Sequence, residues 1–260
     1  MPTLDRSPAQ PKPAQLKTAL AALALLFLGL YLPWSGQQFL VRHWMKIGTL
    51  AAPMLVFVAV EFRSPDARWG EREWGLTMLL AYIGHQFEEH WFDLYGREYA
   101  FIESVNQMFG DVNPLTPEGV YVINTALVWL IGFQSILWAN WSARPLSAMW
   151  GIMVVNAFVH VAACFAQGAR YNPGLLTAAL VFLPVSVIFA RSLQTRSDGK
   201  RWLRHGFLYG LVGHMVMVAG IVASGVKAAL SESAYFAILV AYSLIPTVFA
   251  WRDRGVGEST

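Results

Sequence analysis

The sequence LSAMWGIMVVNAFVHVAACFA occupies residues 146–166 and contains no Asp, Glu, Lys or Arg. At a rise of about 1.5 Å per residue, a helix of this length crosses the hydrocarbon core of a bilayer, which is roughly 30 Å thick. Asn156, His160 and Cys164 follow one another at intervals of four residues, so they share one face of such a helix. Small residues flank this face, as expected where membrane helices pack together. The segment is therefore predicted to be a transmembrane helix with its polar face turned into a bundle.

The composition of the whole chain indicates the same environment. Of its 260 residues, 56% are hydrophobic and 13% are charged, whereas soluble proteins carry about 25% charged residues. Apolar stretches predict helices at 17–32, 47–60, 74–92, 119–138, 146–166, 174–190, 202–224 and 234–250. The expected fold class is an all-α transmembrane bundle of about eight helices. It would form a single domain over residues 17–250, between a disordered N-terminal tail at 1–16 and a C-terminal tail at 251–260.

The distribution of basic residues predicts the orientation of this bundle. With both termini on one side, 14 of the 19 Lys and Arg residues fall on that side. Loops rich in Lys and Arg remain in the cytoplasm, so both termini are expected there, in a multi-pass protein of the cell's inner (cytoplasmic) membrane. The same topological role accounts for the net charge of +3. No nucleic acid is expected as a partner.

A second polar cluster lies near the end of the predicted helix 74–92. At about 100° per residue, His85, Glu88 and Glu89 share an arc about 100° wide. Ionisable groups at membrane depth are costly and normally face the bundle interior, where they mark functional sites. His85 and His160 are predicted at depths of about 17 and 21 Å from the inner edge. We therefore expect the two histidines to meet in the outer half of the bundle.

Other polar residues are predicted around the same layer. The turn at Tyr171 would lie over the pocket, Asn124 could form hydrogen bonds within it, and His214 extends a face that also holds Gly206 and Gly210. His214 is expected to be a packed or hydrogen-bonded histidine. His90 is expected at the membrane interface, where aromatic and amphipathic residues gather. The long connection at 93–118 is either a lid over the pocket or a solvated loop.

Three motifs in order resemble a known family. The sequence HQFEE at 85–89, the separate His160 and the sequence YNPG at 171–174 resemble the HXXEE family of membrane proteins, and the resemblance covers about residues 70–195. It implies a multi-helix membrane protein whose function is not established. The resemblance therefore supports the site more than it supports any reaction.

The residue types at this site favour metal chemistry. The single cysteine, Cys164, excludes a cysteine-based metal cage. His85 and His160 with Glu88 or Glu89 suit one divalent ion, zinc or iron, with open positions for water or substrate. The remaining glutamate could act as general base, and Asn156 or Tyr171 could polarise a substrate oxygen.

The leading functional prediction is a metal-dependent hydrolase acting on a lipid-like or small amphipathic substrate, with membrane lipids as its surroundings. A proton- or cation-coupled transporter and a metal-free acid/base isomerase are the alternatives, because buried carboxylates also suit proton transfer. A pocket closed on the inside and open sideways to lipid would favour the enzyme. A water-filled path reaching both faces would favour the transporter. The oligomeric state is not predicted.

Overall fold

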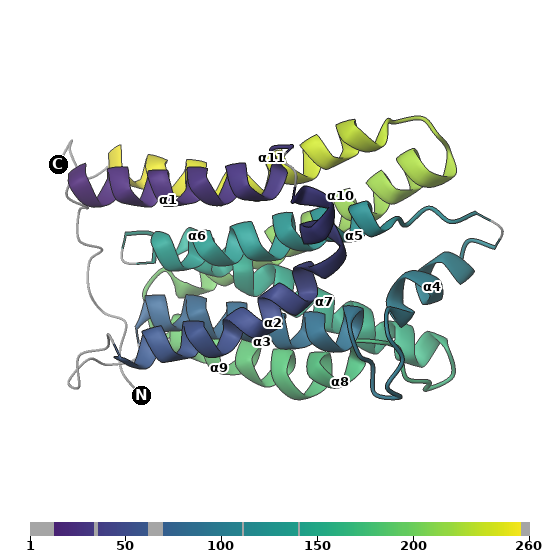
Figure 1. The fold of residues 1–260 in the computed structure, drawn as a ribbon. Coiled ribbons are helices and arrows are strands. Elements are labelled where there is room, and N and C mark those ends of the chain that lie inside the picture. The colour runs from purple at the N-terminus through teal and green to yellow at the C-terminus, as the bar shows by residue number, and fades with distance from the viewer. Residues whose placement is uncertain (1–12, 34–35, 62–69, 111, 140, 256–260) are drawn as a thin grey trace.

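The computed structural model describes residues 13–33, 36–61, 70–110, 112–139 and 141–255, and within these ranges it is all-helical. Continuous helices form most of the bundle (Figure 1). They are α1 (Pro13–Tyr31), α2 (Gln37–Glu61), α3 (Glu71–His90), α4 (Ala100–Gln107), α5–η1–α6 (Pro117–Asn124, Thr125–Leu130 and Ile131–Leu137), α7 (Arg144–Ala166), α8–η2–α9 (Leu175–Thr177, Ala178–Phe182 and Leu183–Gln194), α10–η3 (Gly199–Ile221 and Val222–Val226) and α11 (Glu232–Gly255). The predicted all-α fold class is confirmed for these residues.

Six helices of the described ranges are long and apolar enough to cross a membrane, which supports a multi-pass membrane protein. These segments are Ala14–Tyr31, Pro117–Leu137, Arg144–Ala166, Leu175–Gln194, Gly199–Val226 and Glu232–Arg252. The other two predicted spans are not among the six: 47–60 lies within α2, and 74–92 coincides with α3 up to its end at His90. α3 is more polar than the six because it carries acidic residues in its first turn and again near its end. The polar residues near its end form the site described below.

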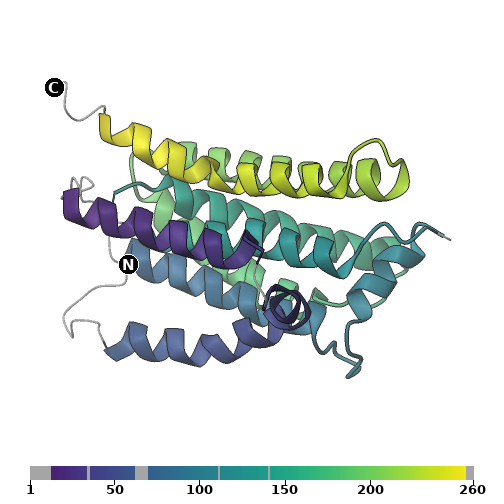
Figure 2. The same ribbon diagram turned by 45° about the horizontal axis from the view of Figure 1, so that its top comes forward.

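The two ends of the bundle are different. In both views the start of α1 and the end of α11 lie at one end, whereas α4 lies at the opposite end (Figures 1 and 2). The connection at 93–118, predicted to be either a lid or a solvated loop, contains the short helix α4. This opposite end of the bundle also contains the polar ends of α3 and α7.

Several boundaries differ from those predicted. α1 begins at Pro13, four residues before the predicted start at 17, and α11 continues to Gly255, past the predicted end at 250. Residues 1–12 and 256–260 of the predicted tails lie outside the described residues. α2 begins at Gln37, so the helix starts ten residues before the predicted span at 47–60.

Glycines allow α7 and α10 to pack closely. A Cβ atom added to Gly206 would collide with the backbone oxygen of Ser147, and one added to Gly210 would collide with the backbone oxygen of Gly151. The backbones of the two helices are therefore in direct contact. This is the arrangement that small residues spaced four apart produce in membrane bundles.

We predict that Gly210→Ala destabilises the protein by about 1–3 kcal/mol, because the added methyl group must separate two packed backbones. Gly29→Ala in α1 is the matched control, since nothing lies within 4 Å of a Cβ atom at that position. The measurement is the thermal unfolding midpoint of both variants in detergent. Equal midpoints for the two variants would contradict the close approach of α7 and α10.

Candidate metal centre

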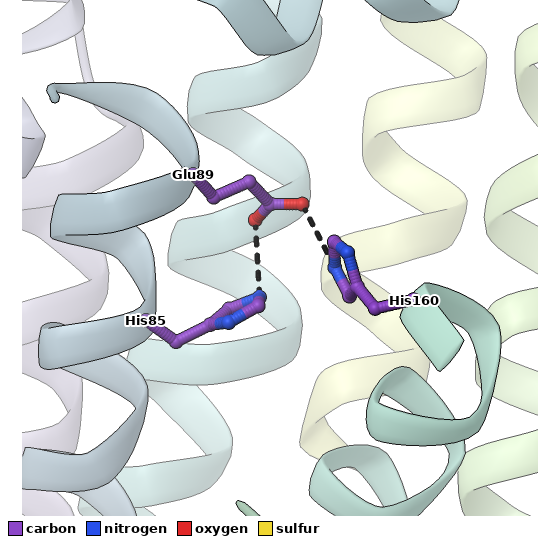
Figure 3. A group of neighbouring side chains, drawn as sticks. All are labelled: His85, Glu89 and His160. Carbon is purple, nitrogen blue, oxygen red and sulfur yellow. Dashed lines mark ion pairs between the residues drawn. The ribbon is translucent and has the colours of Figure 1, made fainter. Parts of the chain in front are cut away.

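The ends of α3 and α7 bring three side chains with metal-binding atoms together (Figure 3). His85 and Glu89 are one turn apart on α3, and His160 comes from α7. The two oxygens of Glu89 lie 3.4 Å from Nε2 of His85 and 3.3 Å from Nε2 of His160. All three residues are buried, and one ligand atom from each lies within 4.8 Å of the others. We call these residues the His–Glu cluster.

The predicted meeting of His85 and His160 is confirmed, since their ring centroids are 4.8 Å apart. Both helices run toward the α4 end of the bundle (Figure 1), so residues at similar distances from the helix starts reach the same layer. The agreement follows from the fixed rise of an α-helix.

A hydroxyl group determines the tautomer of His85. Thr177 Oγ1 has one hydrogen, and the acceptors within its reach are Oε2 of Glu88 at 2.6 Å and the backbone oxygen of Gly174 at 3.2 Å. With that hydrogen committed, Thr177 Oγ1 accepts a hydrogen bond from Nδ1 of His85 at 2.9 Å. Nε2 of His85 then carries a lone pair, and no hydrogen-bond donor among the described residues reaches it.

Asn172 has the same effect on His160. Its Nδ2 donates to the backbone oxygen of His160 at 3.1 Å, and this contact identifies the two ends of the amide because a carbonyl can only accept. Oδ1 of Asn172 therefore accepts from Nδ1 of His160 at 2.7 Å. Nε2 of His160 is left with a lone pair on the side of Glu89. Histidines that bind metals usually have their second ring nitrogen held by such a partner.

The His–Glu cluster therefore contains three groups that can only accept. Two imidazole lone pairs and a carboxylate repel one another in a buried site unless a cation or additional protons lie between them. Two imidazoles and one carboxylate suit zinc or non-haem iron. The cluster could hold a metal ion in this way.

Glu88, the other carboxylate of the motif, contacts α8 and the turn before it. Its Oε1 accepts hydrogen bonds from the backbone nitrogen of Leu176 at 2.9 Å and from the hydroxyl of Tyr171 at 3.0 Å. Its Oε2 accepts from the backbone nitrogen and Oγ1 of Thr177 at 2.7 and 2.6 Å. Burial raises the pKa of Tyr171, so its hydroxyl keeps the hydrogen that it donates. Of the two carboxylates that the sequence left open as ligands, the geometry brings Glu89 into the cluster.

Gly174 completes the turn directly against the two histidines. Its φ of +90° lies in the left-handed region, and a Cβ atom there would lie 2.6 Å from Cε1 of His85 and 2.8 Å from Cε1 of His160. No other residue type fits both the backbone conformation and this close contact. The turn at 171–174 therefore holds Glu88, orients His160 and covers both rings.

The two motifs and the separate His160 thus form one structural unit. Residues 76–189 match the HXXEE family. The family is described as a protein of unknown function with HXXEE motif, and the match confirms the resemblance predicted from the sequence. No match was found among curated proteins or solved structures. We call residues 76–189 the HXXEE segment. It ends within α9, so α10 and α11 lie beyond it.

The HXXEE segment holds a further histidine beside the cluster that helical periodicity missed. His90 is 3% exposed, and its Nε2 lies 2.9 Å from Oε2 of Glu89 and 3.1 Å from Nδ2 of Asn124. The expectation of an interfacial position did not indicate this burial. His90 lies outside the arc of the other polar residues of α3, but Trp44 of α2 and Phe101 of α4 pack against its ring and help to bury it. The sequence offered one signal for a position of His90 near the cluster, namely the prediction that Asn124, which contacts it, joins the same layer.

A cavity of about 320 Å³ adjoins the cluster. Glu89 and His160 line it, as do the side chains of Asn156 and His214. Most of its remaining wall is apolar and comes from α4, α5, α7 and α10. Asn156 therefore faces the cavity as the sequence suggested, whereas the hydroxyl of Tyr171 is engaged by Glu88. The catalytic roles suggested for Glu88, Asn156 and Tyr171 stay predictions.

The cavity occupies one half of the bundle. On α3, α7 and α10 the first lining residues are Tyr82, Ile152 and His214, so the starts of these helices do not contribute. At its other end, lining residues include Met108 and Val218, which are 67% and 52% exposed. The described part of the cavity thus extends from the cluster to exposed apolar side chains near α4.

We predict that Glu88→Gln destabilises the protein by about 1–3 kcal/mol. The carboxylate now accepts hydrogen bonds on both oxygens, whereas the amide nitrogen of Gln would face donors from which it cannot accept. Glu103→Gln is the control, since Glu103 is exposed on α4 and accepts one hydrogen bond from Gln107. Thermal unfolding in detergent measures both. A Glu88→Gln variant as stable as the control would contradict the anchoring role of Glu88.

Proposed function

We propose that this protein is a membrane-embedded, metal-dependent enzyme in which His85, Glu89 and His160 bind one zinc or iron ion. One observation carries the proposal: the Nδ1 hydrogens of both histidines are already committed to Thr177 and Asn172. The Nε2 lone pairs and the carboxylate of Glu89 consequently meet in a buried space. A divalent cation relieves this repulsion with ligands that such ions prefer.

The proposed reaction is hydrolysis. A metal ion at this site would supply an acidified water molecule and polarise a substrate oxygen. Asn156 lies on the cavity wall, where its amide can orient the substrate. His90 lines the same cavity in contact with Glu89, which favours it over Glu88 as the group that exchanges a proton with the substrate. Glu88, with its four accepted hydrogen bonds, instead supports the turn.

The proposed substrate is lipid-like or another amphipathic molecule. The cavity is polar at the cluster and apolar elsewhere, and exposed apolar side chains lie at its far end. Its confinement to one half of the bundle favours an enzyme over a transporter, because a transporter needs a route to both faces of the membrane. The proposed topology has eight spans with both termini in the cytoplasm, in the cell's inner membrane, which puts the site in the outer half.

Metal analysis of the purified protein tests the proposal. We expect about one equivalent of zinc or iron per chain. The variants His85→Ala, Glu89→Ala and His160→Ala should each lose the metal while remaining helical and monodisperse. His205→Ala is the matched control, because His205 is exposed on α10, outside the cluster, and it should keep the metal.

The absence of metal from every preparation, even after supplementation with zinc and iron, would sink the metal proposal. The cluster would then carry additional protons, and assays of isomerisation and of proton-coupled uptake into proteoliposomes would test the two alternatives.

We further predict that Asn172→Ala lowers the metal affinity by about 10–100-fold, because it removes the acceptor that orients His160. Competition with a chromophoric chelator measures this affinity. Gln107→Ala, at an exposed position on α4, should leave it unchanged. An unaltered affinity in the Asn172→Ala protein would show that the tautomer of His160 does not depend on Asn172.

A further inference from the structure

α10 lies beyond the HXXEE segment but forms part of the cavity next to the cluster. The contact of Gly151 with Gly206 and Gly210 brings α10 against α7. Asn156 follows Gly151 by five residues and His214 follows Gly210 by four, so each lies about 6–8 Å further along its helix. Both helices run toward the α4 end (Figure 1). Asn156 and His214 therefore reach the cavity in one layer.

The ring of His214 is oriented by its own helix. Nδ1 donates to the backbone oxygen of Gly210 at 2.8 Å, since that oxygen can only accept. Nε2 of the neutral imidazole is then an acceptor, and no donor among the described side chains reaches it. His214 is 9% exposed and lines the cavity. Its free acceptor therefore belongs to a largely buried, oriented side chain.

Asn156 supplies a second acceptor without a partner. Its Oδ1 is buried, and no described donor is within hydrogen-bonding distance. Buried acceptors are nearly always paired, so each exception needs an explanation. Asn156 and His214 both line the cavity, and each carries an acceptor without a donor among the described residues, so the two side chains suit a molecule that donates hydrogen bonds.

The charge and shape of the cavity narrow the class of that molecule. No Lys or Arg is among its described lining residues, so a carboxylate or phosphate head would lack a counter-charge beside His214. Apolar side chains, including Met217 and Ile221 of α10 and Phe101 of α4, form much of the remaining wall. The volume of about 320 Å³ is at the small end of the range for small-molecule sites, about 300–1,000 Å³, which suits one alkyl chain.

We propose that His214 and Asn156 form a head-group site that selects an uncharged, single-chain amphiphile through a hydroxyl or amide N–H group. This inference deepens the proposed function by naming its substrate class. It rests on the proposed function only for the statement that the bound molecule is a substrate. Binding itself needs only the cavity and the two acceptors. α10 thus adds specificity to a centre that the HXXEE segment builds.

Binding of four probes to the full chain in lipid nanodiscs tests the inference. The probes are dodecanol and N-methyldodecanamide, which donate a hydrogen bond, methyl laurate, which does not, and laurate, which is charged. Displacement of a fluorescent fatty alcohol measures each affinity. We expect both donor probes to bind about tenfold more tightly than methyl laurate. Equal binding of dodecanol and methyl laurate to the unaltered protein would overturn the proposal without any variant.

Variants then assign the selectivity to the two acceptors. His214→Phe and Asn156→Leu keep the approximate side-chain volume and remove the acceptor, so each should lose most of the preference for donor probes. Met217→Leu, an apolar exchange in the same wall, should keep it. Preserved selectivity in both acceptor variants would contradict the assignment.

The His85→Ala variant separates this inference from the metal proposal. Its head-group site is intact, so the preference for dodecanol over methyl laurate should persist even if metal is never found. Tighter binding of laurate than of dodecanol to this variant would overturn the uncharged head group.

Discussion

The carboxylate of Glu88 is the contact on which the site depends. It accepts four hydrogen bonds from the segment that joins α7 to α9. In a bilayer these donors would have no water to replace the carboxylate. By holding Thr177 in position, Glu88 also orients His85, and by holding Tyr171 it keeps the turn that carries Asn172 and Gly174 beside the two histidines.

The site that results is rich in acceptors. Each histidine has its donor committed to a neighbour, and Glu89 adds a carboxylate between the two rings. Buried charges are tolerated in proteins when they are paired or coordinate a metal. The electrostatic requirement for a cation or for protons is thus built into the hydrogen bonds around the cluster, and it is independent of any particular reaction.

Two parts of the bundle line the cavity. The HXXEE segment supplies the cluster and the turn that supports it, whereas α10 and α4 supply much of the surface that a substrate would contact. Close packing through Gly206 and Gly210 connects the two parts, because it brings His214 level with the cluster. Under the proposed function, α10 would contribute to the choice of substrate, and the HXXEE segment would supply the chemistry.

The sequence by itself determined the helices, since long apolar runs have few other structures available in a membrane. It also predicted that His85 and His160 meet beside a glutamate of α3, because helical rise and periodicity are fixed. Only the tertiary structure decided between Glu88 and Glu89, which are neighbours on the same helical arc. The difference arises from what packs against each carboxylate: α8 and the turn before it against Glu88, and α7 against Glu89. The burial of His90 and the exposure of His214 to the cavity likewise depend on which helices pack together, α2 and α4 against the end of α3 and α10 against α7. Helical periodicity carries no information about that choice.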